Sequence, residues 1–179
     1  MRTGSPTLTQ MDTSAVFLDL YDRIPPLVEE AVTGLDAEDL ASPPAPGANT
    51  IGWLTWHLTR VHDSHVAEVL EERQLWETGD FAQGFGLEPD PHNTGYGHSP
   101  ADVASVRPLD PTAVLTYHQA VFERTHAYLS RLTGNDFDRI VDENWDPPVT
   151  LGVRLVSVAD DCLEHVGQAN YVHSILARR

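Results

Sequence analysis

The C-terminal segment 149–179 repeats apolar residues at the three- and four-residue steps of an α-helix, and this pattern constrains the fold more than any other. The spacing predicts one long helix with a single face turned toward a core. Such a face is stable only when other elements pack against it, so the rest of the chain must supply them. The stripe consists of Leu155, Val158, Cys162, His165, Ala169, Val172 and Leu176.

Three other segments show the same helical period. The first covers residues 12–34, with a bend expected at Pro25-Pro26 because proline has no backbone N–H to donate. The second covers residues 51–73 and the third residues 111–134, and alternating strand-like runs are almost absent. The predicted fold class is therefore all-α, an antiparallel four-helix bundle with long ordered loops between helices. Asn49-Thr50 is expected to cap the second helix, and Asp110 is expected to cap the third.

The connection 74–109 is far longer than the roughly 15 residues beyond which a loop usually has a function. It is rich in aromatic residues and glycine, so it is expected to form an ordered lid or rim over the bundle. Residues 1–10 are polar and are expected to form a disordered lead-in. Residues 11–179 are then expected to form a single bundle domain.

The charge of the chain excludes two classes of partner. Eleven Lys and Arg stand against 27 Asp and Glu, which gives a net charge of −16 with neutral histidines. Such a chain repels phosphate backbones and anionic membrane surfaces, so neither nucleic acid nor a membrane is expected as a partner. No apolar run reaches the roughly 18 residues of a membrane span, and the N-terminus lacks the pattern of a signal peptide. These features predict a cytoplasmic protein.

The single cysteine, Cys162, has no partner for an internal disulfide. It lies on the apolar stripe of the last helix, where a packed and unreactive thiol is expected rather than a nucleophile. If the protein catalyses thiol chemistry, the reacting thiol must come from outside the chain.

Asp161 and His165 lie one helical turn apart, beside and on that same stripe. Burying a carboxylate costs several kcal/mol unless it is paired or bound to a cation. An acid beside a core histidine therefore requires a partner, and a divalent metal would satisfy both side chains.

The second helix carries three more histidines near its apolar face: His57, His62 and His65. Its period favours His65, but spacing alone does not select one of the three, and a role as packed core histidines without metal is an equal alternative. The other histidines lie without a paired ligand, and surface or locally hydrogen-bonded roles are expected for them: His92, His98, His118, His126 and His173.

Two helix strings resemble motifs of the DinB-like superfamily, in particular its actinobacterial branch of mycothiol-dependent transferases and maleylpyruvate isomerases. Residues 49–65 resemble the second-helix motif, and the string Asp161-Cys-Leu-Glu-His165-Val-Gly-Gln168 is similar to its His-x-x-x-His-x-Gly-Gln pattern. The loop string Thr94-Gly-Tyr-Gly-His98 also resembles that branch.

The resemblance implies a metal held by one residue of the second helix and two of the fourth, which are His57, Asp161 and His165 here. The chain departs from the family at Asp161, where histidine is the commonest residue, so the affinity for metal should differ. His65 has no role in the family pattern and is expected in the core or behind the ligands. Asp63 and Gln168 are expected behind the ligands as well.

Two imidazoles and one carboxylate leave coordination positions open for water or substrate. Zinc is the expected ion, and nickel, iron and manganese are compatible with the same ligands. A thiol coordinated to zinc loses its proton near neutral pH. The resemblance implies mycothiol as the cosubstrate, a small electrophile as its partner, and pairing into a homodimer.

Five further residues are candidates for the substrate pocket, with simple packing as the alternative for each. Trp53, Trp56, Tyr96 and Trp145 could form its walls, and Arg60 could meet an anionic group.

Two other functions remain open. Water at the same metal would make the protein a hydrolase or amidase, and a bundle without working metal would be a non-catalytic, stress-associated protein.

Overall fold

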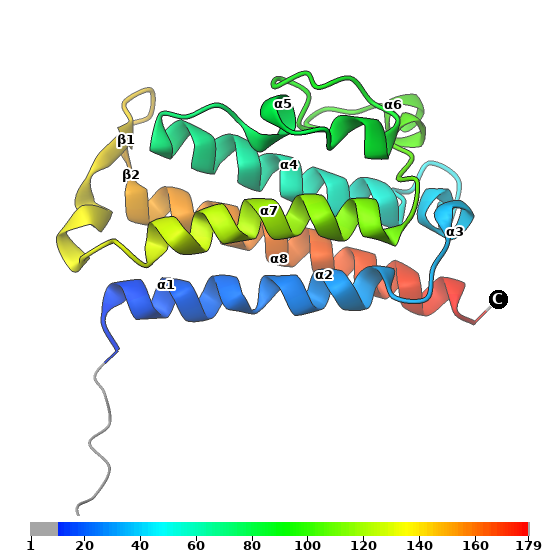
Figure 1. Ribbon diagram of the computed structural model, residues 1–179, viewed down its shortest axis with the longest axis horizontal. Helices are drawn as coiled ribbons and strands as arrows, with labels where there is room; N and C mark the ends of the chain where they lie inside the picture. The colour runs from blue at the N-terminus through cyan, green and yellow to red at the C-terminus, as the bar shows by residue number, and fades with distance from the viewer. Residues whose placement is uncertain (1–10, 179) are drawn as a thin grey trace, which may run out of the picture.

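The computed structural model describes residues 11–178 and confirms the four-helix bundle (Figure 1). The predicted lead-in at residues 1–10 lies outside the described residues. Each of the four predicted helical segments becomes one rod of the bundle. These rods are α1 (Thr13–Asp22) with α2 (Ile24–Val32), α4 (Ile51–Leu70), α7 (Pro111–Leu129) and α8 (Leu151–Leu176).

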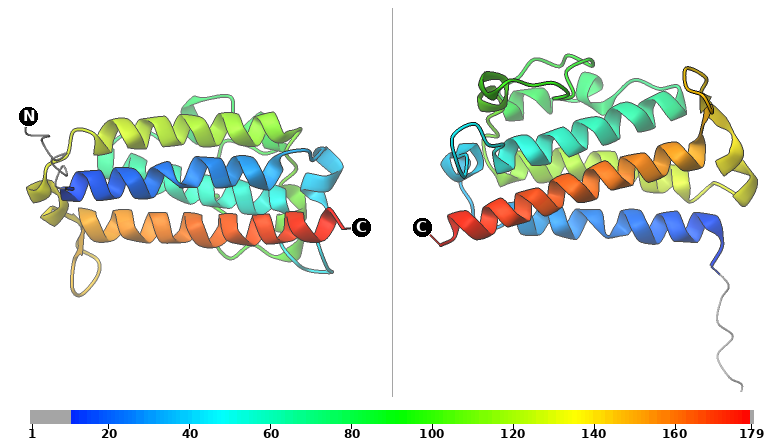
Figure 2. Two further views of the ribbon diagram at one scale, coloured as in Figure 1. Left: turned by 90° about the horizontal axis from the view of Figure 1, so that it is seen from below. Right: turned by 180° about the vertical axis from the view of Figure 1, so that it is seen from behind.

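The helices do not simply alternate in direction. The rod α1–α2 and helix α8 run one way, and α4 and α7 run the other way (Figures 1 and 2). Helix α4 packs against both α8 and α7, and α1–α2 packs against α7 and α8. The neighbours α4 and α8 are therefore antiparallel, whereas α4 and α7 are parallel because the connection between them returns along the outside of the bundle.

Short elements fill the connections. The long connection between α4 and α7 is ordered, as predicted, and a small antiparallel hairpin precedes α8. Val149 and Thr150, predicted as helical, belong to that hairpin, because Thr150 caps α8 and a cap residue has extended backbone angles. The short elements are α3 (Ala37–Ala41), α5 (Leu75–Thr78), η1 (Ala82–Phe85), α6 (Pro100–Ser105), η2 (Gly134–Asp138), β1 (Ile140–Asp142) and β2 (Val149–Thr150).

Helices α4 and α7 begin directly after the capping residues that the sequence predicted. The side chain of Thr50 accepts a hydrogen bond from the backbone N–H of Trp53 at 3.0 Å, and that of Asp110 accepts from Ala113 at 2.8 Å. Each cap satisfies a donor that the first turn of a helix cannot satisfy itself. The first rod breaks at Arg23, immediately before Ile24-Pro25-Pro26, as the proline pair predicted.

Burial in the core explains why the sequence showed a clear apolar stripe on α8 but not on α4. On α8, the predicted stripe is buried, except that His165 and Leu176 are partly exposed. Helix α4 is instead buried on every side from residue 51 to residue 60, because α7 and α8 cover its inner faces and the 71–110 connection covers its outer face. No helix within residues 11–178 is both long and apolar enough to cross a membrane.

Candidate metal centre

His57, Asp161 and His165 converge between α4 and α8. One possible ligand atom from each residue lies within 4.8 Å of the other two, and this is a distance that one ion could bridge. The rings of His57 and His165 meet edge to face, with centroids 4.7 Å apart. The structure thus brings together the three residues that the family resemblance selected.

The close approach of α4 and α8 brings these side chains together. The Sγ atom of Cys162 lies 3.7 Å from the carbonyl oxygen of Leu58, so a small side chain of α8 touches the backbone of α4. His57 precedes Leu58 and Asp161 precedes Cys162 along the chain, so both lie beside this contact. His165 follows one turn later on the same side of α8 as Asp161.

The hydrogen bonds of His57 determine which ring nitrogen is free. Its Nδ1 lies 2.5 Å from the carbonyl oxygen of Thr94. A carbonyl can only accept, so Nδ1 carries the hydrogen and Nε2 keeps its lone pair. The ring of Trp53 stacks on His57, with centroids 4.6 Å apart and planes at 12°. The imidazole is therefore held from two directions.

His165 is oriented in a similar way. Its Nδ1 lies 3.2 Å from Oε1 of Gln168, and its Nε2 lies 3.6 Å from Oδ1 of Asp161. The other oxygen of Asp161, Oδ2, is buried and has no hydrogen-bond partner in the part of the chain that the structure describes. A buried carboxylate oxygen without a partner is costly, which indicates that a ligand belongs there.

Burial moves the pKa values of these groups in directions that suit a bound cation. Desolvation lowers the pKa of His57 to about 4, with smaller contributions from His165 and His98, although the hydrogen bond to Thr94 opposes the change. Desolvation also raises the pKa of Asp161, and His165 partly opposes it. His57 is thus neutral at pH 7 and can donate a lone pair, while the charge on Asp161 needs a compensating cation.

These residues fit a divalent metal. Histidine ligands in proteins usually donate the second ring nitrogen to a carbonyl or another acceptor, as His57 does to Thr94 and His165 does to Gln168. The side chains of His165 and Asp161 are 19% and 29% exposed, so the centre can be reached from solvent. Two nitrogens and one oxygen leave coordination positions open.

His65, which the period of the second helix favoured, lies away from this centre. It is partly exposed and lies 3.4 Å from Glu68 through its Nδ1. The helical period of apolar residues favoured His65 wrongly, because it assumes that a helix has one buried face. The first half of α4 is instead buried on all sides. The prediction of a place behind the ligands is wrong for His65, and it suits Gln168.

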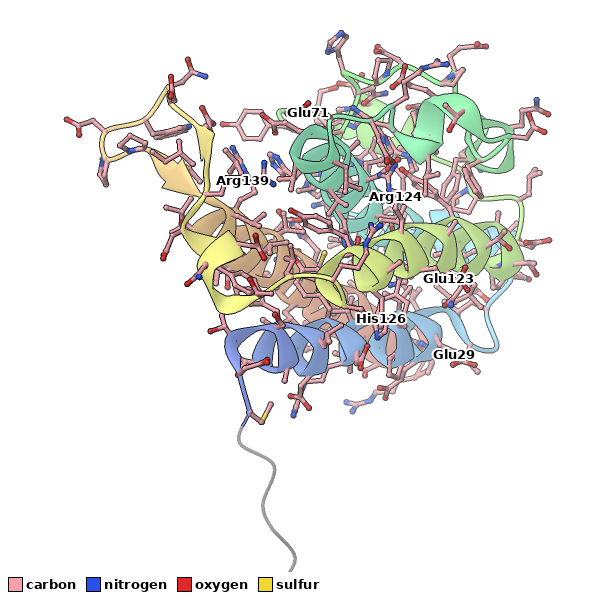
Figure 3. All side chains as sticks on the ribbon, turned by 60° about the vertical axis from the view of Figure 1, so that its left-hand side comes forward. Glu29, Glu71, Glu123, Arg124, His126 and Arg139 are labelled. Carbon is pink, nitrogen blue, oxygen red and sulfur yellow. The ribbon has the colours of Figure 1, made fainter. Side chains whose placement is uncertain are left out.

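Arg60 and Asp63 belong to a buried polar cluster rather than to a substrate pocket. Arg60 is fully buried and donates hydrogen bonds to several acceptors of the chain, so its guanidinium is not free to meet a ligand. Asp63 accepts from the backbone N–H groups of Leu75 and Trp76 and pairs with Arg124. Arg124, labelled in Figure 3, is part of α7. Neither prediction, an anion contact for Arg60 or a place behind the ligands for Asp63, matches these contacts.

Of the four aromatic candidates, Trp53 lies at the centre. Trp56 is fully buried and packs on His98, while Tyr96 is 95% exposed. Trp145 is 67% exposed in the turn between β1 and β2, and within residues 11–178 no ring contact or hydrogen bond joins it to the three ligand residues. The structure therefore places Trp53 beside the ligands and assigns Trp56 to packing.

The sequence interpretation missed the role of the loop that follows α5. Thr94 supplies the carbonyl to His57. His98 is hydrogen-bonded at both ring nitrogens, which fits the locally hydrogen-bonded role expected for it. Its Nδ1 accepts from Nε1 of Trp53 at 3.1 Å, and its Nε2 donates to Oδ1 of Asn93 at 2.9 Å. The sequence feature that pointed to this role was the string from Thr94 to His98, which resembles a loop of the mycothiol-dependent branch.

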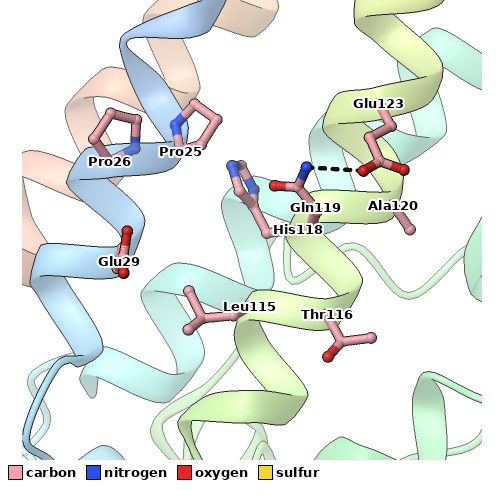
Figure 4. Close-up of a pocket in the computed structure, with 9 residues that line it drawn as sticks. All are labelled: Pro25, Pro26, Glu29, Leu115, Thr116, His118, Gln119, Ala120 and Glu123. Carbon is pink, nitrogen blue, oxygen red and sulfur yellow. Dashed lines mark hydrogen bonds between the residues drawn. The ribbon is translucent and has the colours of Figure 1, made fainter.

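A separate groove of about 700 Å³ lies between α2 and α7 (Figure 4). His118, for which a surface or locally hydrogen-bonded role was expected, forms part of its wall; the ring is almost fully buried, and its Nδ1 lies 3.3 Å from the hydroxyl of Thr59. Glu29 and Glu123 also line this groove, and none of the three candidate ligands does. The groove is therefore distinct from the candidate metal centre.

Comparison with known proteins agrees with this architecture. A conserved protein from Enterococcus faecalis is 27% identical, with a TM-score of 0.85 over 95% of this chain and 100% of that chain. YfiT from Bacillus subtilis, described as a probable metal-dependent hydrolase with an unusual four-helix bundle topology, is 17% identical, with a TM-score of 0.64 over 98% of this chain and 94% of that chain. Among curated proteins none matches. Residues 20–169 match the DinB superfamily, and the chain belongs to this superfamily.

Proposed function

We propose that this protein is a metal-dependent transferase that joins an external small-molecule thiol to an electrophile. His57, Asp161 and His165 would hold the divalent ion, with zinc as the first choice. The observation that carries the proposal is the arrangement of the two imidazoles. Each has its Nδ1 engaged by an acceptor of the chain, and within residues 11–178 neither Nε2 makes a hydrogen bond and Oδ2 of Asp161 has no partner.

When bound, a divalent ion lowers the pKa of a coordinated thiol or water molecule into the neutral range. The remaining tasks fall to the chain itself. Thr94 and Gln168 orient the two imidazoles, and Trp53 covers one face of His57 and excludes water from it. The partly exposed side of Asp161 and His165 is the side from which small molecules can enter.

The state of Cys162 supports an external thiol. It is the single cysteine of the chain, it is fully buried, and burial raises its pKa well above the usual value. A thiol in this state stays protonated and does not meet substrate. Mycothiol is the thiol that we propose, because the loop string that resembles the mycothiol-dependent branch is the same loop that contacts His57.

Two measurements test this proposal. Protein purified without added metal should contain or rebind about one equivalent of a divalent ion, and less than about one-tenth of an equivalent would indicate a non-catalytic bundle. The metal-loaded protein should then conjugate mycothiol to an electrophile such as monochlorobimane, and His165→Ala should lose this activity. His126→Ala, a change at a partly exposed histidine of α7, is the matched control.

A metal-dependent hydrolase is the second candidate. The same three ligands could activate water, and YfiT carries that description in a similar fold. Cleavage of esters or amides without added thiol, lost in His165→Ala, would support hydrolysis and overturn thiol transfer.

A further inference from the structure

Arg60 lies one helical turn after His57 on α4, and its side chain is fixed deep in the bundle. Its Nη1 donates to the hydroxyl of Tyr117 at 3.1 Å and lies 3.5 Å from Oδ2 of Asp63. Its guanidinium also lies over the ring of Trp76, 4.9 Å from the centroid. A fully buried cation persists only with such partners, so this inner side of Arg60 is held in one place.

The outer side of the same guanidinium holds the connection that returns along the bundle. Its Nε donates to the carbonyl of Asn93 at 3.1 Å, and its Nη2 donates to the carbonyls of Pro91 at 3.1 Å and Asp90 at 3.5 Å. These residues lie in a segment without regular secondary structure. The planar group holds these three carbonyls from two separate nitrogens in a rigid fork, and the single ammonium of a lysine does not reproduce this geometry.

This segment leads directly to the carbonyl that binds His57. We call residues 90–98 the strap. Asn93, held by Arg60, is followed by Thr94, whose carbonyl oxygen lies 2.5 Å from Nδ1 of His57. The side chain of Asn93 also holds His98, which in turn accepts from Trp53. The position of the strap therefore decides whether His57 has its acceptor.

We infer that Arg60 is a positioning residue for the metal centre: it holds the strap so that the carbonyl of Thr94 keeps the hydrogen of His57 on Nδ1 and leaves Nε2 free for the ion. The inference rests on the proposed metal site. Among the described residues, the hydrogen bonds of Arg60 reach none of the candidate ligands, so it acts through the strap.

Arg124 provides a matched control. It also pairs with Asp63, at 2.5 Å, and it donates to the carbonyls of Asp63 and Arg73. Within residues 11–178, Arg124 donates no hydrogen bond to the strap, whereas Arg60 donates three. Replacing either arginine leaves Asp63 with one cation fewer, but only the change at Arg60 should release the strap.

The direct test is ¹⁵N NMR of the His57 ring in metal-free protein at pH 7.5. In the wild type we expect one tautomer, with the hydrogen on Nδ1. Arg60→Lys should give a mixture of tautomers and amide hydrogen exchange at Thr94 and His98 at least about tenfold faster, whereas Arg124→Lys should leave both unchanged. An unchanged His57 tautomer in Arg60→Lys, or equal changes in both variants, would overturn the inference.

Zinc titration gives a second measurement. Loss of a group behind a metal ligand typically weakens affinity by about 10- to 100-fold, and we expect this for Arg60→Lys but not for Arg124→Lys. If the wild type binds no zinc, the proposed function fails, while the NMR result on metal-free protein still decides the role of Arg60. If Arg60→Lys does not fold, a second pair of variants makes the same comparison. The single variant Asp63→Asn keeps Arg60, and the double variant adds Arg60→Met to it. The mixture of His57 tautomers should then appear only in the double variant.

Discussion

The carbonyl oxygen of Thr94 accepts a hydrogen bond from Nδ1 of His57 at 2.5 Å, across 37 residues of sequence. This contact joins the long connection to the candidate metal centre. The connection, which covers the outer face of α4, therefore also orients a candidate ligand. Changes in the loop should alter metal binding, although within residues 11–178 the candidate ligand set includes no loop residue.

Gly95 gives a direct test of this contact. A Cβ atom there would lie 2.7 Å from Nδ1 of His57 and 2.9 Å from the ring of Trp56, and its φ of +95° is unfavourable for other residues. Gly95→Ala should weaken zinc affinity at least about tenfold and lower the free energy of unfolding by about 1–3 kcal/mol. Zinc titration and chemical denaturation measure the two effects.

Gly97→Ala is the matched control for that prediction. Gly97 also has a positive φ, +74°, but a Cβ there would meet nothing within 4 Å. We expect a loss of about 1 kcal/mol from backbone strain alone, with zinc affinity unchanged. Equal losses of zinc affinity in both variants would contradict a specific contact at Gly95.

Asp161→Asn should separate metal binding from stability. The asparagine keeps the shape but removes the charge, so we expect zinc affinity to fall by more than about 100-fold, beyond the usual effect of a residue behind a ligand. Because burial raises the pKa of Asp161, its charged form is unfavourable in the metal-free fold at pH 7. The metal-free variant should therefore melt at a higher temperature than the metal-free wild type. A lower melting temperature would show that Asp161 has a stabilising partner instead.

Asp63 should be far more important for stability than any surface acid. It is fully buried and pairs with Arg124 at 2.5 Å and with the hydroxyl of Tyr117 at 2.8 Å. Asp63→Asn leaves buried cations without a counterion and should cost about 3–5 kcal/mol. Asp19→Asn removes an exposed pair with Arg23 and should cost less than about 1 kcal/mol. Urea denaturation compares the two, and similar losses would refute the role of Asp63.

Acid should destabilise the fold well before most carboxylates titrate. Burial lowers the pKa of His62 to about 3 and that of His118 to about 4, and among the described residues one nitrogen of each ring has no hydrogen-bond partner. The unfolded chain binds protons near pH 6.5 and the folded chain does not, so stability is complete above about pH 7 and falls as the pH drops toward 4. We expect these two histidines together to lower the free energy of unfolding by about 5 kcal/mol at about pH 4.5.

Denaturation curves from about pH 7.5 to 4.5 measure this loss. His118→Gln should show a shallower dependence on pH, because glutamine does not titrate. His92→Gln, a change at an exposed loop residue, should keep the slope of the wild type. A stability that does not change over this range would contradict neutral, buried histidines. Asp161 acts in the opposite sense, since its raised pKa favours the fold as it becomes protonated.

Local patterns predicted the elements of this fold because they depend only on nearby residues. The period of residues 149–179, the caps at Thr50 and Asp110, and the break before Pro25 all appear as expected. The pairing of Asp161 with His165 is local too, since four residues make one turn of a helix.

Tertiary structure alone decided the rest. Which histidine of α4 reaches the centre depends on how α8 and the 71–110 connection cover that helix, and burial all round removed the period that favoured His65. From the sequence, Arg60 was a candidate to meet an anionic group of the substrate. In the structure it is buried and donates to carbonyls 30 to 33 residues away. Spacing along one helix reports the turn of that helix, whereas contacts between distant segments exist only once the chain has packed.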